Sequence, residues 1–260
     1  MRTDDFTRVR AVLERDREWA AFALADLAPE HCGYCEWHLA DGATALVLIY
    51  RGFNPPLFFA QGNATDVMPL IADVASEPEL YVSLRGDLLA HMASAGYQVH
   101  DAKRLYRMVQ RSPTASPVDG LVRRLGAEDY YALDRLYADG EATGERPAFF
   151  QQSSMANGVY FGVYDGDALV ATAGTLVCAP EQSVACIGNV YVRRDRRGRG
   201  LGSAVTSAVA GELRTMGLRT IALNVRTDNH AAVRVYERLG FERYCEYQEA
   251  RLVYGRSATV

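Results

Sequence analysis

Hydrophobic and polar positions change their period along the chain, and each change predicts where a helix or a strand begins. Apolar residues recur every three or four positions over 4–28, which predicts a helix. The runs at 43–50 (ATALVLIY) and 56–60 (PLFFA) are rich in β-branched and aromatic residues, which favour strands. The same patterns then predict helices at 64–75 and 86–95 and strands at 79–84 and 97–109.

The second half of the chain repeats this order of helices, a group of strands, and then alternating helix and strand. We interpret both halves as α/β, and the repeated order leaves open whether they are structural duplicates, because no sequence repeat is visible. The predicted elements are strands at 120–125, 159–165, 168–178, 184–193, 219–225 and 241–253, and helices at 127–138, 147–156, 200–216 and 229–239.

A stretch rich in proline and small polar residues separates the two halves. The segment RSPTASPVDG at 111–120 has two prolines and no periodic apolar pattern, whereas its neighbours have one. Such segments are typical of boundaries between domains. The sequence therefore predicts an N-terminal α/β domain over 1–112, a linker over 113–118 and a second domain over 119–260.

Composition narrows the class of protein. The 260 residues are 49% hydrophobic and carry a formal net charge of −4, which argues against nucleic acid or an anionic membrane as partner. Apolar runs stay well short of the length that spans a membrane, and the N-terminus lacks the apolar stretch of a signal peptide. Five cysteines are an odd count, which favours reduced thiols and a cytoplasmic location.

An arginine- and glycine-rich turn between a predicted strand and a predicted helix is the first candidate site. Gly198, Gly200 and Gly202 lie where the strand ends and the helix begins. The first turn of a helix has main-chain N–H groups without internal partners, and glycines let an anion approach them closely. The segment therefore predicts a phosphate or diphosphate site; the alternative is a solvated arginine-rich turn. Five arginines add positive charge there: Arg193, Arg194, Arg196, Arg197 and Arg199.

Two common phosphate-binding motifs fit this turn poorly. A P-loop needs a Lys-Ser/Thr pair after its last glycine, and none follows Gly202. A dinucleotide fingerprint would place its third glycine one residue later and would end the next strand with an acidic residue, whereas 223–225 reads Leu-Asn-Val. A dinucleotide-binding protein therefore remains an alternative that the spacing does not favour.

A second candidate site lies on the predicted helix at 229–239. Asn229 is a natural N-cap, and Gly240 stands where the C-terminus of a helix favours a left-handed residue. Tyr236 follows Asn229 by seven residues, so the two share a face about 10 Å apart along the axis. A long, thin ligand could meet both side chains; the alternative is that Tyr236 is an ordinary core aromatic.

Together these two segments resemble the GNAT superfamily of acetyl-CoA-dependent N-acetyltransferases over about 119–253. The matching motifs are Arg197-x-x-Gly200-x-Gly202 and, some thirty residues later, Asn229…Ala232…Tyr236…Leu239-Gly240-Phe241. The resemblance implies a mixed, splayed sheet flanked by helices, with acetyl-CoA wedged between the strands at 184–193 and 219–225. The N-terminal half has no such turn, its nearest counterpart being 60–64 (AQGNA), so it would be a degenerate second copy in tandem.

The resemblance also implies a role for each matching residue. Main-chain amides from Arg197 to Ser203 would hold the diphosphate, Asn229 would contact pantetheine, and Tyr236 would protonate the departing thiolate. The implied activity is transfer of acetyl from acetyl-CoA to a primary amine of a small molecule or peptide, by direct attack in a ternary complex and without a metal. The implied donor-binding residues are Val190, Tyr191, Val192, Arg197, Gly198, Arg199, Gly200, Leu201, Gly202, Ser203 and Asn229.

The sequence departs from the family in its general base. Many members carry a carboxylate on the strand before the turn, whereas 184–192 reads VACIGNVYV. Glu141, Glu145 and Glu181 lie in nearby loops, and the choice among them stays open. This departure keeps a second alternative open, a module that binds acyl-CoA without turnover. Asn189, Phe149, Phe150 and Tyr160 are candidates for lining an acceptor pocket.

A separate cluster of thiols and imidazoles occurs in the N-terminal half. Cys32 and Cys35 lie between His31 and His38, a spacing that could hold zinc or form a redox pair. A second cysteine pair is absent, and the segment crosses from a helix to a strand, so structural thiols are the favoured interpretation.

Overall fold

The computed structural model describes residues 1–74, 77–114, 122–147, 150 and 152–255. Most of the predicted linker at 113–118, and Phe149, lie outside these residues. None of the helices in the part of the chain so described is long and apolar enough to cross a membrane.

The chain forms two compact units, which we call unit 1 and unit 2. Unit 1 comprises Met1–Arg107 and Tyr244–Val260, and unit 2 comprises Met108–Arg243. The sequence instead assigns 244–260 to the second domain. The difference arises because the last strand, β12 (Phe241–Tyr254), pairs antiparallel with β5 (Glu79–Leu84) of unit 1, from Gln248↔Leu84 to Val253↔Glu79.

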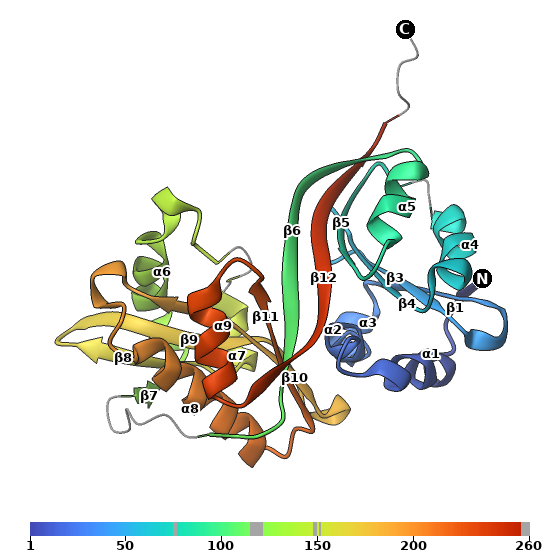
Figure 1. The fold of residues 1–260 in the computed structure, drawn as a ribbon. Helices are drawn as coiled ribbons and strands as arrows, with labels where there is room; N and C mark the ends of the chain where they lie inside the picture. The colour runs from blue at the N-terminus through green and yellow to red at the C-terminus, as the bar shows by residue number, and fades with distance from the viewer. Residues whose placement is uncertain (75–76, 115–121, 148–149, 151, 256–260) are drawn as a thin grey trace, which may run out of the picture. The chain divides into compact units, whose positions relative to one another are not determined.

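Unit 1 is a mixed sheet with helices packed against it (Figure 1). Its strands follow the order β1-β2-β3-β4-β5-β12, antiparallel except for the parallel pair β4–β5. β6 (Tyr97–Gln110) begins in unit 1 and ends in unit 2. The remaining bounds are β1 (Arg2–Thr3), β2 (Cys35–Leu39), β3 (Leu46–Tyr50), β4 (Leu57–Gln61), α1 (Phe6–Leu13), α2 (Ala21–Ala25), α3 (Pro29–Cys32), α4 (Ala64–Val74) and α5 (Leu88–Ser94).

The prediction of one helix over 4–28 is wrong. The structure has α1, a 3-10 turn at Glu14–Asp16 and then the short helix α2. A charged run interrupts the apolar spacing at this point, and the Asp16 carboxylate accepts a hydrogen bond from the main-chain N–H of Trp19. Short polar side chains that bond nearby main-chain groups compete with the helical pattern, which ends the helix early.

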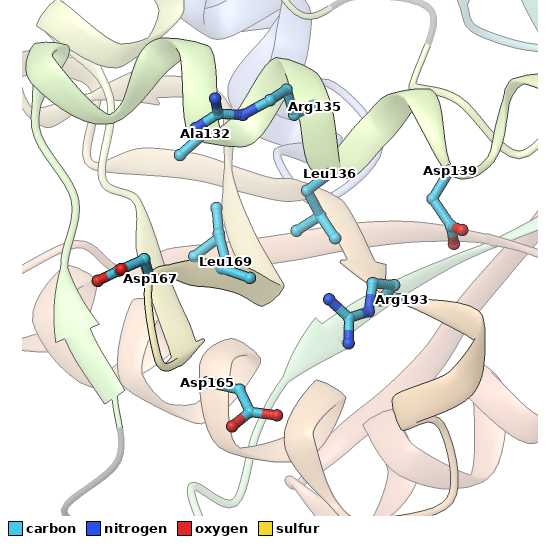
Figure 2. Close-up of a pocket in the computed structure, with 9 residues that line it drawn as sticks. Ala132, Arg135, Leu136, Asp139, Asp165, Asp167, Leu169 and Arg193 are labelled. Carbon is cyan, nitrogen blue, oxygen red and sulfur yellow. The ribbon is translucent and has the colours of Figure 1, made fainter.

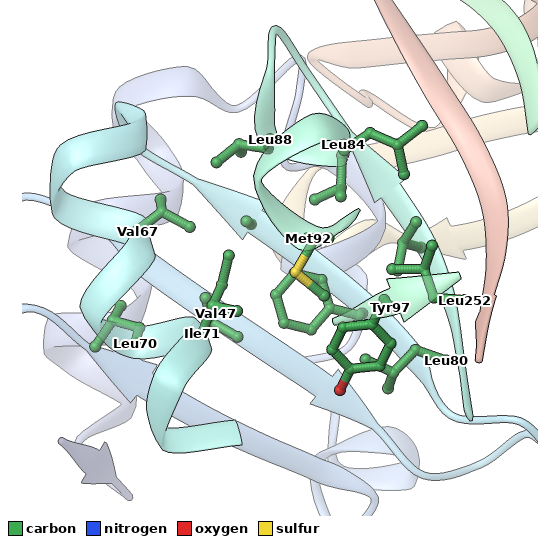
Figure 3. Packing of buried hydrophobic residues seen from close by; sticks show 14 of the residues in the cluster. Val47, Val67, Leu70, Ile71, Leu80, Leu84, Leu88, Met92, Tyr97 and Leu252 are labelled. Atoms are coloured by element: carbon green, nitrogen blue, oxygen red, sulfur yellow. The ribbon is translucent and has the colours of Figure 1, made fainter. Parts of the chain in front are cut away.

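The core of unit 1 is an apolar cluster between its sheet and the helices α4 and α5 (Figure 3). Ile71 from α4 and Met92 from α5 are buried against strand residues such as Val47. Leu252 of β12 is fully buried in the same cluster. The strand β12 is therefore part of the core of unit 1.

Unit 2 contains strands that lie side by side in the order β11-β10-β9-β8-β7, parallel between β11 and β10 and antiparallel for the rest. The helix α8 packs on β9 and β10, and α6 packs on β9. Its bounds are β7 (Val122–Arg124), β8 (Phe161–Asp165), β9 (Ala168–Ala179), β10 (Val184–Val192), β11 (Thr220–Arg226), α6 (Tyr130–Ala138), α7 (Gln152–Asn157), α8 (Leu201–Thr215) and α9 (His230–Arg238).

The sheet of unit 2 splays between β10 and β11. Their parallel pairing runs from Val184↔Thr220 to Ile187↔Leu223 and then stops, although β10 continues to Val192 beside β9. The second half of β10 therefore lacks a ladder partner on its β11 side. The predicted fold class, a mixed, splayed sheet flanked by helices, is confirmed.

Candidate functional site

The glycine turn predicted to bind phosphate joins β10 to α8. Gly198 and Gly200 have φ angles of 78° and 79°, in the left-handed region that favours glycine. Gly200 is the N-cap of α8 and offers no side-chain hydrogen bond to the first-turn amides. A Cβ at Gly202 would contact only Val192 Cγ2, at 3.4 Å. Packing within the protein does not require glycine at 202, so the residue leaves space beside free main-chain donors.

The arginines beside this turn are mostly neutralised, which corrects the expectation of five free positive charges. Among the described residues, Arg199 is the one arginine of the five without an ion pair. The carboxylate partners come from distant loops as well as from the turn itself, so sequence reasoning missed them. The pairs are Arg193–Asp195, Arg194–Asp139, Arg196–Asp165 and Arg197–Glu145.

Arg197 folds back over the end of β10. Its guanidinium forms two hydrogen bonds to the Glu145 carboxylate, at 3.0 and 3.1 Å, and its Nε donates to the carbonyl of Val192. It also lies over the ring of Tyr191, 5.6 Å from the centroid. The hydrogen bond from Arg197 lowers the pKa of Glu145, so this candidate general base is an ionised partner of Arg197 in the absence of ligand.

The predicted residues of α9 lie at its start and on its buried face. The Asn229 side chain is the N-cap and accepts a hydrogen bond from Ala232 N at 3.1 Å. Tyr236 is 8% exposed, and its ring lies edge-on to Phe241. The described residues provide no hydrogen bond to its hydroxyl. Burial raises the pKa of Tyr236 to about 12, so the phenol keeps its proton at neutral pH and can donate it.

A β-bulge interrupts β10 at the predicted pantetheine-binding residues. The register with β9 passes from Gly188↔Gly174 to Tyr191↔Thr172, so Asn189 and Val190 together oppose one residue. The side chain of Tyr191 is buried and donates to Asp139 at 2.9 Å, which leaves only its main chain for a ligand. The bulge falls in the half of β10 that β11 does not cover.

The candidates for an acceptor pocket lie inside unit 2. Tyr160 is fully buried, Asn189 donates from its side chain to the Tyr160 hydroxyl, and Phe150 stacks on Tyr130. The structure places these side chains in an aromatic core and not on an open surface. Glu141 pairs with Arg146 in the loop after α6, so Glu145 is not the only loop carboxylate with a cationic partner.

A surface cavity of about 550 Å³ lies between α6 and the β8–β9 hairpin. Figure 2 shows the side chains of Leu136 and Leu169 between charged residues that include Asp165 and Arg193. In the described part of the chain, none of the residues predicted to bind the donor lines it. The cavity borders the arginine turn through Arg193, which pairs with Asp195.

The cysteine pair of unit 1 is reduced. The Cys32 thiol donates to the carbonyl of Pro29, and the Cys35 thiol donates to those of Asp26 and His31. Burial raises the pKa of Cys35, which opposes formation of a reactive thiolate. Within the ranges that the structure describes, no three His, Cys, Asp or Glu residues gather as a metal-binding group.

Sequence comparison relates the chain to acetyltransferases. Residues 126–241 match the family model described as "Acetyltransferase (GNAT) family". A mycothiol acetyltransferase of Geodermatophilus obscurus is 42% identical over 89 residues, which cover 33% of this chain and 29% of that protein. A mycothiol acetyltransferase of Thermobispora bispora is 29% identical over 253 residues, covering 86% and 81%. The match to the first relative thus spans under a third of either protein.

Comparison with solved structures extends the similarity to nearly the whole chain. A tandem GNAT protein of the clavulanic acid biosynthesis pathway has a TM-score of 0.57 at 16% identity and covers 98% of this chain and 97% of its own. A GCN5-related N-acetyltransferase of Kribbella flavida has a TM-score of 0.61 at 15% identity, covering 94% and 96%. At such identities the likeness concerns the fold, and it includes both units.

Proposed function

We propose that this chain, whose residues 126–241 match the GNAT acetyltransferase family, transfers acetyl from acetyl-CoA to a primary amine. One observation carries the proposal. A glycine turn with an uncapped helix N-terminus stands beside the point where the parallel pair β10–β11 parts. Free main-chain donors and an uncovered strand edge are what a ligand with a diphosphate and a thin amide-containing arm requires.

The donor would bind along β10 and the start of α8. Main-chain amides of Arg197–Ser203 hold the diphosphate, and the unpaired Arg199 adds a cation beside it. Main-chain groups of Val190, Tyr191 and Val192 take the place of the missing β11 ladder and bond the pantetheine arm. Asn229, at the start of α9, has a free amide N–H₂ for the same arm because its oxygen serves as the N-cap.

Two groups would stabilise the charge that develops during transfer. Attack of the neutral amine on the thioester carbonyl produces an oxyanion, for which the main-chain N–H of Val190 in the bulge is a fixed donor. The carbon–sulfur bond then breaks, and the electron pair leaves on sulfur. The Tyr236 hydroxyl donates a hydrogen bond to this thiolate.

The pKa of Tyr236 determines how the phenol acts. Full transfer from a phenol of pKa about 12 to a thiolate whose conjugate acid has a pKa of about 8.5 is uphill by about 5 kcal/mol. Tyr236 therefore acts mainly as a hydrogen-bond donor to the developing thiolate. The attacking nitrogen releases its extra proton to solvent, and solvent returns one proton to the thiolate, so that the products are a neutral amide and a neutral thiol. Donation to a charged acceptor is worth about 1.5–3 kcal/mol.

Deprotonation of the amine relies on no side chain of β10. The strand reads VACIGNVYV and has no Asp, Glu or His. We propose that the amine binds as its free base, so the rate rises with pH until the pKa of the amine itself is reached. The relatives named mycothiol acetyltransferase make mycothiol lacking its acetyl group one acceptor to test, beside small amines, amino acids and peptides.

Calorimetry and a thiol-release assay test the function. CoA is expected to bind, whereas NAD and ATP are not, and selective binding of NAD would replace the proposal with a dinucleotide-binding role. The assay measures the free thiol released from acetyl-CoA across the panel of amines. If CoA binds but every amine gives only the hydrolysis background, the chain is an acyl-CoA-binding module without turnover.

A further inference from the structure

We propose that Tyr137, Asn189 and Tyr160 form a buried clamp that aims the main-chain N–H of Val190 at the acetyl carbonyl. These three would be positioning residues, because their side chains are all buried inside unit 2. The inference rests on the proposed acetyl transfer. The clamp adds to that proposal a way in which buried side chains orient the main-chain N–H that binds the reacting carbonyl.

The bulge needs a clamp because its conformation is unfavourable. Asn189 has a φ of 51°, in the left-handed region. That region costs a residue with a side chain about 1–2 kcal/mol, although asparagine tolerates it better than most. A strained residue keeps its conformation only where the surrounding structure holds it. The register shift between Gly188 and Tyr191 also removes the ladder that would otherwise hold this part of β10.

The first part of the clamp fixes the peptide unit between Asn189 and Val190. The Tyr137 hydroxyl, from α6, donates to the Asn189 carbonyl at 2.9 Å, and the Tyr137 side chain is 1% exposed. The carbonyl of one residue and the N–H of the next belong to one planar trans peptide, so they point in opposite directions. Holding the Asn189 oxygen toward α6 therefore turns the Val190 N–H away from it.

The second part of the clamp fixes the side chain of Asn189. Its Nδ2 donates to the Tyr160 hydroxyl at 2.8 Å, and that hydroxyl donates to the carbonyl of Thr175, on β9, at 3.2 Å. Tyr160 is fully buried. One phenol, Tyr137, thus binds the carbonyl of Asn189, and the other, Tyr160, binds its side chain. The bond from Tyr160 to Thr175 links the bulge to the neighbouring strand β9.

Both phenols are unsuited to acid–base chemistry, which leaves positioning as their role. Burial raises the pKa of Tyr137 and of Tyr160, so each keeps its proton and remains a donor at neutral pH. A buried polar network must be fully bonded to avoid a cost, and phenylalanine would fill the same space without that requirement. The presence of two buried hydroxyls bonded to one bulge is explained if the orientation of that bulge matters.

The test compares ligands that differ at the carbonyl. Tyr137→Phe removes one hydrogen bond and little volume, and kcat is expected to fall about tenfold, the value of one net hydrogen bond of about 1.4 kcal/mol. The affinity for CoA, which has no acetyl carbonyl, should remain within about twofold of wild type. The preference for acetyl-CoA over S-ethyl-CoA, a thioether without the carbonyl, should fall by about the same factor as kcat. The ¹⁵N-valine spectrum of the unliganded protein reports the Val190 N–H directly and should show its resonance shifted and exchange-broadened.

A second variant and a control keep the test decisive. Asn189→Gly adopts the same φ without strain but loses the side-chain bond to Tyr160, and it should share the defect even if Tyr137→Phe folds poorly. Tyr164→Phe removes another phenol of unit 2, bonded to Asp129 at 2.8 Å, and should leave kcat and the ligand preference unchanged.

Each outcome separates the clamp from the proposed function. If both variants keep the wild-type kcat and ligand preference, or lose affinity for CoA as much as kcat, the three residues only stabilise the fold and the inference is overturned. If the wild-type protein binds no CoA at all, the proposed function itself fails.

Discussion

Each unit contains a parallel strand pair whose hydrogen bonding stops partway, and the two differ in what fills the place where the strands part. In unit 1 the pairing of β4 with β5 ends at Phe59↔Ser83. The Trp19 indole stacks on Phe59 and donates to the carbonyl of Ala60 at 2.9 Å. The place that corresponds to the proposed donor site of unit 2 is thus occupied in unit 1 by a side chain of the protein itself.

In each parallel pair a helix follows the first strand, α4 after β4 and α8 after β10, and the N-termini of these two helices differ as well. In unit 1 the Asn63 side chain accepts from the N–H of Asp66 at 2.9 Å, so a first-turn amide of α4 already has a partner. Asp66 also places a negative charge in that turn. The first turn of α8 has no acidic residue, and its N-cap, Gly200, has no side chain. The N-terminus of α4 repels an anion, whereas that of α8 attracts one.

The comparison explains how a copy of the fold can lose its ligand without losing its fold. An indole and an N-cap satisfy the donors and acceptors that a ligand would otherwise satisfy, and the sheet remains intact. The predicted degeneracy of the N-terminal copy is in keeping with this arrangement. Unit 1 then serves as a packed structural body, and we expect one molecule of acetyl-CoA per chain.

The largest effect is expected at the indole. Trp19→Ala removes a fully buried side chain that contacts Phe59 and Tyr247, and it should destabilise unit 1 by about 3–5 kcal/mol. Thermal unfolding measures the loss, and calorimetry should still give one CoA per chain. A second equivalent of bound CoA in the variant would mean that Trp19 alone blocks a competent site.

A large effect on binding is expected at the glycine turn. Gly202→Val places a branched side chain beside the first-turn amides, and the affinity for CoA should fall by more than about 100-fold, or roughly 3 kcal/mol. The melting temperature should change little, because a Cβ there meets only Val192. Gly211→Val makes the same change in the middle of α8 and should leave CoA binding intact. Equal losses in both variants would point to the helix and not to the site.

A moderate effect on turnover is expected at the phenol. Tyr236→Phe removes the donor to sulfur, so kcat should fall by about 10- to 100-fold while the affinity for acetyl-CoA stays within about twofold. Steady-state kinetics and calorimetry give the two quantities. Tyr247→Phe, in unit 1, loses a hydroxyl bonded to Glu249 and serves as the control. Equal loss of kcat and affinity would make Tyr236 a packing residue.

The smallest effect is expected at the ion pair of the turn. Glu145→Gln releases Arg197 from its carboxylate, and because exposed ion pairs are worth about 0.2–1 kcal/mol, the affinity for CoA should rise by about threefold. Glu141→Gln alters a carboxylate of the same loop, one that pairs with Arg146, and should leave the affinity for CoA unchanged. Weaker binding in Glu145→Gln would show that the pair holds the turn in its binding conformation.

The sequence predicted best where apolar spacing decides the structure. The helices α8 and α9 and the strand β11 between them match the expected ranges closely, because each helix has one buried face and β11 is a short, almost wholly buried run. The expected crossing from helix to strand within 31–38 is present, because α3 ends at Cys32 and β2 begins at Cys35, but the charged and imidazole groups of CEWHL obscured the bounds of β2. The local pattern of apolar and polar residues predicts a helix or strand well where burial follows that pattern, and poorly where polar side chains pair with one another within the sheet.

The parts that sequence could not supply depend on contacts between distant residues. Asp139, Asp165 and Glu145 form ion pairs with arginines that lie 31 to 55 residues away in the chain. The sequence around those arginines does not predict these pairs. The clamp on Asn189 likewise joins residues 29 and 52 positions apart. The glycine turn could be predicted because its chemistry is contained in ten consecutive residues.

The pairing of β12 with β5 has a consequence for the order in which the polypeptide matures. A ribosome releases the chain from its N-terminus, yet the first unit lacks one strand until residues 248–253 have been made. During most of synthesis the β5 edge and the surface that Leu252 later covers are exposed to water. Unit 1 is therefore completed only after unit 2 has been made, and a nascent chain stopped anywhere in unit 2 would present an incomplete, adhesive sheet.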